Sequence, residues 1–66
     1  MAYLNLKGEM AKRDITTEKI SNLLNLHRNS VSNKLKGLSS FSIDEAMKVK
    51  DAYFPDCAIE ELFKKD

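Results

Sequence analysis

The stretch TEKISNLLNLHRNSVSNKLKG, residues 17–37, contains two short helical patterns that meet at a four-residue joint. The first pattern repeats apolar residues at Ile20 and Leu24, and the second places Val31 and Leu35 one turn apart. This layout favours a helix-turn-helix pair whose second helix exposes a polar face. We expect the two helices to run from Thr17 to about Leu24 and from about Arg28 to Lys36.

Single residues at the joint favour these helix ends. Thr16 can cap the first helix with its hydroxyl group, and Asn25 suits the left-handed conformation that a tight turn requires. His27 falls at the N-cap of the second helix, where serine, threonine or aspartate would be a stronger cap. Gly37 can close that helix as its C′ residue, and Leu38 is expected to supply the apolar contact that follows such caps.

The segment before this pair is expected to form a helix from about Tyr3 to Arg13. Leu6 and Met10 lie one turn apart in it and should face inward. Gly8 lowers the helix propensity by about 1 kcal/mol relative to alanine, and we expect it to allow close helix packing.

The segment after the pair predicts two further helices. Ser42 and Glu45 form a capping box, and Pro55 prevents the helix that they begin from continuing. Asp56 is expected to cap a last short helix. The fourth helix should run from Ile43 to about Tyr53. One of its faces should carry Ala46, either Val49 or Lys50, and Tyr53. The fifth helix should turn Ile59, Leu62 and Phe63 towards the core. The sequence therefore predicts one all-α domain of five helices over residues 1–66.

Composition excludes several classes of protein. The 66 residues make one small domain, and 32% of them are charged. No apolar run approaches the roughly 20 residues that cross a bilayer, and no signal-peptide pattern begins the chain. The single cysteine, Cys57, is expected to be reduced and part-buried in an intracellular protein. With one histidine, His27, and no nucleophile and base at recognisable spacing, we expect no enzyme, metal site, cofactor or small-molecule substrate.

Charge is divided unevenly along the chain. Residues 1–37 carry seven lysine and arginine residues against three acidic ones, whereas residues 38–66 carry four against seven. The first part is therefore +4 and the second −3, consistent with the net charge of +1. A domain that turns one end towards phosphates would show such a division, although a chance partition of a solvated surface would also produce it.

The polar face of the helix over residues 28–36 carries side chains that can read bases. Arginine presents two donors to guanine, asparagine pairs with adenine, serine bonds several bases, and lysine suits phosphates. The alternative is the solvated face of an ordinary amphipathic helix. The residues on this face are Arg28, Asn29, Ser32, Asn33 and Lys36.

The chain resembles the lambda-repressor-like helix-turn-helix domains of phage Cro and CI repressors, the XRE group. Nearly all 66 residues take part, through ITTEKISNLLNLHRNSVSNKLKG, FSIDEAMKVKDAYF and FPDCAIEELF. The NKLKG and FP…LF patterns look most like small phage-type regulators of Gram-positive bacteria. The chain departs from the usual family pattern at three positions. Ser21 replaces alanine and is small enough for close helix contact, and Asn25 replaces glycine in the turn. Lys34 replaces an apolar residue, so it weakens the core seam and would reach solvent or phosphate.

The resemblance implies a cytoplasmic, sequence-specific transcriptional repressor of a bacterial host that binds double-stranded operator DNA with its third helix in the major groove. By the same resemblance, the base-contacting residues are Arg28, Asn29, Ser32 and Asn33. The phosphate-contacting residues are Thr17, Ser30, Lys36, Ser39 and Ser40.

A homodimer is expected on the operator, because one copy reads only about half a turn of DNA. Core packing is the first interpretation for the apolar residues that end the chain, and a dimer surface is the second; these are Tyr53, Phe54, Ile59, Leu62 and Phe63.

Two other functions stay open. The chain is either a protein-interaction module of antirepressor type that keeps this fold, or the DNA-binding part of a longer repressor; the starting Met1 favours a small complete protein.

Overall fold

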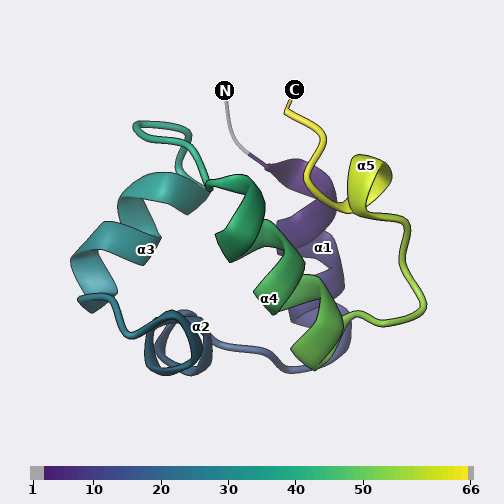
Figure 1. Cartoon of the computed structure of the whole chain (residues 1–66), viewed down its shortest axis with the longest axis horizontal. Helices are drawn as coiled ribbons and strands as arrows, with labels where there is room; N and C mark the ends of the chain where they lie inside the picture. The colour runs from purple at the N-terminus through teal and green to yellow at the C-terminus, as the bar shows by residue number, and fades with distance from the viewer. Residues whose placement is uncertain (1–2, 66) are drawn as a thin grey trace.

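The computed structural model describes residues 3–65 and consists of five α-helices (Figure 1). No residue in this range belongs to a β-strand, and the domain measures 26 × 23 × 22 Å. The predicted all-α class is confirmed. The helices are α1 (Leu4–Lys12), α2 (Thr17–Leu24), α3 (Arg28–Leu35), α4 (Ile43–Tyr53) and α5 (Ile59–Leu62).

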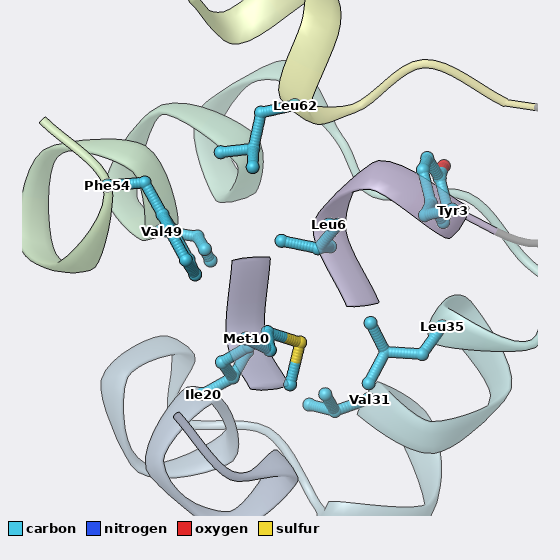
Figure 2. Packing of buried hydrophobic residues seen from close by; sticks show 9 residues of the cluster. All are labelled: Tyr3, Leu6, Met10, Ile20, Val31, Leu35, Val49, Phe54 and Leu62. Carbon is cyan, nitrogen blue, oxygen red and sulfur yellow. The ribbon is translucent and has the colours of Figure 1, made fainter. Parts of the chain in front are cut away.

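One hydrophobic core joins all five helices (Figure 2). On α4 the predicted Ala46 and Val49 are buried, whereas Lys50 stays at the core margin and donates to the Pro55 carbonyl at 3.2 Å. Phe54, which follows α4, is fully buried and is one of the largest side chains of the core. The core cluster comprises Tyr3, Leu6, Met10, Ile20, Val31, Leu35, Val49, Phe54 and Leu62.

Side-chain caps fix where α2 and α4 begin. The Thr16 hydroxyl accepts from the Lys19 amide at 3.2 Å. Before α4, the Ser42 hydroxyl accepts from the Glu45 amide at 3.1 Å, while the Glu45 carboxylate accepts from the Ser42 amide at 2.9 Å. The predicted cap and capping box are confirmed. Because both use residues three positions apart, local sequence determines them.

Three helices end at a residue in the left-handed conformation. These residues are Asp14 (φ 58°), Asn25 (φ 56°) and Gly37 (φ 85°), after α1, α2 and α3. In each case the following amide bonds back to a helix carbonyl, as Leu38 does to Asn33 at 3.0 Å. The turns at Asn25 and Gly37 are confirmed. The expected apolar contact of Leu38 is wrong, since 75% of this residue is exposed.

The predicted cap at Asp56 is wrong, because this carboxylate binds Arg13 at the end of α1. The guanidinium donates to both Asp56 oxygens, at 2.7 and 2.8 Å, and to the Tyr53 carbonyl at 3.1 Å. It also lies over the Phe54 ring, 5.2 Å from its centroid. The hydrogen bonds that Arg13 donates to the Asp56 carboxylate lower the pKa of Asp56 and raise the pKa of Arg13. Helix α5 instead begins after Ala58, which makes no side-chain cap bond.

The two ends of the described chain lie on the same side of the domain (Figure 1). Asn5 Nδ2 of α1 donates to the Glu61 carbonyl of α5 at 2.8 Å, and both residues line a groove between these helices. Gly8 also lines this groove, and a Cβ built on it has no atom within 4 Å. The expectation that Gly8 permits close packing is therefore wrong. No helix in residues 3–65 has the length and apolar character needed to cross a bilayer.

Candidate nucleic-acid interface

Helix α3 is held at one edge of the domain, on the side away from α5 (Figure 1). Val31 and Leu35 anchor it in the core, as predicted, and α2 packs against it. At its start, His27 Nδ1 accepts from the Asn29 amide at 3.1 Å. The predicted histidine cap is confirmed. The polar side of α3 is therefore fixed relative to the core.

The outer face of α3 presents most of the predicted base-reading residues. Arg28, Asn29 and Asn33 are exposed, and the hydrogen bonds in residues 3–65 leave all three side chains without a protein partner. Ser32 is half-buried, so its hydroxyl lies at the edge of this face rather than at its centre. Ser30 is exposed and lies, by helical rotation, on the opposite flank from Ser32. The face thus offers a guanidinium and two carboxamide groups to an incoming partner.

A groove between α1, α2 and α3 joins residues that are far apart in sequence. Thr17 at the start of α2 lines it together with Ser32 and Lys36, which come from α3 and the residue that follows it. Lys7 of α1 lines the same groove, and it is exposed. The amino end of a helix and two ammonium groups create a positive potential there. The groove can therefore accept an anionic oxygen such as that of a phosphate.

Sequence reasoning gave Lys7 no place in the interface. The sequence does indicate on which side of its helix Lys7 lies, because Lys7 stands three residues before Met10 and this spacing puts both residues on one side of the helix. Met10 also lines the groove, where α1 meets α2 and α3. What the sequence does not show is that α3 returns to this side of α1.

The loop after α3 carries Ser39 and Ser40, and both are exposed. The Ser40 hydroxyl accepts from Lys65 Nζ, and the Ser40 carbonyl accepts from Lys34 Nζ at 2.9 Å. Since a hydroxyl both donates and accepts, Ser40 still has its proton to offer to a phosphate. The loop lies beyond the carboxyl end of α3, at the opposite end of that helix from the His27 cap.

Lys34 is not free for solvent or phosphate, so that expectation is wrong. Only 17% of its side chain is exposed, and its ammonium lies 3.2 Å from a Glu45 oxygen and 5.9 Å from the Phe41 ring centroid. The pKa of Glu45 is lowered, first by the hydrogen bond from the Ser42 backbone and further by Lys34. Lys34 therefore closes the seam between α3 and α4 with an ion pair.

Ion pairing separates the cations of residues 1–37 into two groups. Lys12, Arg13 and Lys34 are paired with carboxylates. No ion pair within residues 3–65 involves the others, which are Lys7, Lys19, Arg28 and Lys36. This second group comes from α1, α2 and the α3 segment, the three elements around the groove. Of this second group, Lys7 and Lys36 line the groove.

Core packing, the first interpretation for the apolar residues that end the chain, is confirmed for Phe54 and Leu62, and a dimer surface there stays a prediction. Phe54 and Leu62 are buried in the core, and the other three candidates are half-buried. Cys57 is half-buried and unpaired, as expected, and its sulfur accepts from Arg13 at 3.4 Å. Within residues 3–65, His, Cys, Asp and Glu side chains form no group of three or more suited to a metal ion.

Comparison of the chain with protein-family models, with curated proteins and with solved structures gives no match. The function of the chain is therefore inferred from the geometry of α2, α3 and the groove beside them.

Proposed function

We propose that this chain is a sequence-specific DNA-binding repressor of the lambda-repressor-like type. In the proposal α2 and α3 form the helix-turn-helix, and α3 enters the major groove of operator DNA. The repressor would act by occupying the operator, where it blocks polymerase or a competing repressor. The observation that carries the proposal is the exposed polar face of α3 beside a groove that contains Lys7 and Lys36.

The exposed side chains divide by chemistry into readers and clamps. Arg28 suits a guanine edge, and Asn29 and Asn33 suit adenine edges, with Ser32 beside them. Thr17 and Lys36 contact phosphates from the groove, and Lys7 adds a third contact there. Ser30 contacts the backbone from its own flank of α3. Ser39 and Ser40 contact it from the loop.

Two copies on an imperfect palindrome are needed for useful specificity. One α3 reaches only a few base pairs, whereas two copies on half-sites about one helical turn apart read roughly twice as many. Operator recognition by a homodimer is therefore part of the proposal.

Selection from a pool of random duplexes, performed at about 50 and 200 mM salt, tests the proposal. We expect an imperfect palindrome to be enriched, with an affinity that falls steeply between the two salt concentrations. Binding without sequence preference or salt dependence would contradict the proposal. No binding to any duplex, together with retained folding, would favour the rival function of a protein-interaction module.

A pair of lysine variants on α1 tests the groove itself. Lys7 lines the groove of α2 and α3, whereas Lys12 pairs with Glu9 and lines the separate groove of α1 and α5. If Lys7 neutralises one phosphate, Lys7→Ala reduces the slope of log affinity against log salt by about 0.9. Lys12→Ala is the matched control and should leave that slope unchanged. Equal slopes for Lys7→Ala and the unmodified chain would remove Lys7 from the interface.

A further inference from the structure

Helix α4 exposes an apolar pair on its outer face. Ile43 is 78% exposed and Met47 is 49% exposed, and their spacing of four residues puts them on the same side of the helix. Ile43 also borders an apolar groove between the start of α4 and α5. Ala46, Ile59 and Phe63 line the rest of its aliphatic and aromatic wall, together with Tyr3 and Phe41.

Two opposite charges lie beside this apolar pair. Asp44 and Lys48 are exposed, and each follows one of the apolar residues by a single position. A rotation of about 100° per residue places both charges on the same flank of the apolar pair, one turn apart. Within residues 3–65 neither forms an ion pair. The outer face of α4 is therefore a short apolar strip whose edge carries Asp44 and then Lys48, with the exposed Asp51 one turn further along the helix.

We propose that a second copy of this chain docks on this face, with its α4 antiparallel to the first. A two-fold axis perpendicular to the helices places Asp44 opposite the partner's Lys48, and the same pairing recurs once by symmetry. The axis also brings the partner's Met47 against Ile43, at the mouth of the apolar groove. Methionine is unbranched and flexible, so its side chain can fill such a groove.

Charge selects the antiparallel arrangement and the second copy as occupant. In a parallel two-fold pair the axis runs along the helices and carries the partner's Asp44 and Lys48 to the opposite flank of the strip, so neither attractive contact would form. In the antiparallel pair both contacts are attractive. One strip therefore complements itself in apolar character and in charge, as an isologous interface requires.

The proposed dimer forms without DNA, so it is separate from operator binding. If the chain binds an operator but shows no self-association through α4, this inference fails and the proposed function stands. If α4 mediates self-association but no duplex is bound, the proposed function fails and the dimer stands.

Charge reversal, measured by sedimentation equilibrium of the full chain, tests the arrangement. Asp44→Lys alone and Lys48→Asp alone each make both cross-pairs repulsive, and we expect at least tenfold weaker self-association for each. An equimolar mixture of the two variants makes both pairs attractive, so we expect heterodimers, and the double variant should dimerise as the unmodified chain does. Self-association unchanged in the single variants, or no association in their mixture, would overturn the proposal. So would an unmodified chain that stays monomeric at millimolar concentration.

A second pair of variants keeps the test independent of the charges. Ile43→Lys should abolish self-association, because it puts a charge in the apolar strip. Leu38→Lys, at a similarly exposed leucine outside α4, is the control and should leave self-association intact. Helix content by circular dichroism shows that each variant is folded. Loss of association in both variants, or in neither, would contradict an α4 interface.

Discussion

Alanine substitution at the two glycines should change stability in opposite directions. Gly8 lies within α1, and an added Cβ meets no atom within 4 Å, so Gly8→Ala gains helix propensity without a clash. We expect unfolding free energy to rise by about 0.5 to 1 kcal/mol. For a domain of this size, that gain corresponds to an increase in melting temperature of about 2 to 8 °C. Gly37 has φ 85°, where a Cβ meets the neighbouring carbonyl, so Gly37→Ala should lower the free energy by about 1 to 2 kcal/mol.

Urea titration and thermal melts, both followed by circular dichroism at 222 nm, measure these changes. Equal slopes of free energy against urea would show that the substitutions act on the folded state without changing its compactness. A Gly8→Ala variant that is less stable than the unmodified chain would refute the reasoning, since it would mean that another atom approaches Gly8. A Gly37→Ala variant of unchanged stability would refute the left-handed end of α3.

Three further predictions follow from the same structure. Asn25→Gly should raise unfolding free energy by up to about 1 kcal/mol in urea titrations, because glycine adopts φ 56° without strain; a loss would show that the Asn25 side chain stabilises the turn. Phe54→Ala should lower it by about 3 to 5 kcal/mol, since the ring is fully buried, and a loss below 1 kcal/mol would place Phe54 outside the core. Asp56 has a lowered pKa in the folded chain, so its pairing with Arg13 stabilises the fold above about pH 4 and is lost as pH falls. Melting temperatures from pH 2 to 7 should therefore fall less steeply for Asp56→Asn, and identical profiles would contradict the ion pair.

The sequence predicted those parts of the fold that neighbouring residues determine. The Ser42 and Glu45 capping box, the His27 cap and the turn at Asn25 each involve groups within a few positions, so their spacing is visible in the chain. Partners that are distant in sequence were missed. Asp56 caps nothing because Arg13, 43 positions earlier, binds it, and no local pattern reveals that contact.

For the candidate site, helical spacing predicted which side of α3 faces outward, and Asn29 and Asn33 lie there. It did not predict how other elements surround α3. Lys34 looked available on the sequence, yet Glu45 of α4 holds its ammonium. Lys7 was counted only among the cations of residues 1–37, yet the packing of α1 beside α3 puts it in the groove. Tertiary contacts, rather than residue type, decide which charges remain for a partner.

The most direct test of the proposed DNA-reading role of α3 compares two variants on two duplexes, the selected operator and a random sequence. Asn33→Ala should lose about 1 to 3 kcal/mol of binding free energy on the operator and little on random DNA, because a base contact carries sequence information. Lys36→Ala should weaken both duplexes to a similar extent, because it removes a phosphate contact. An Asn33→Ala variant that binds both duplexes as the unmodified chain does would contradict the reading role of α3.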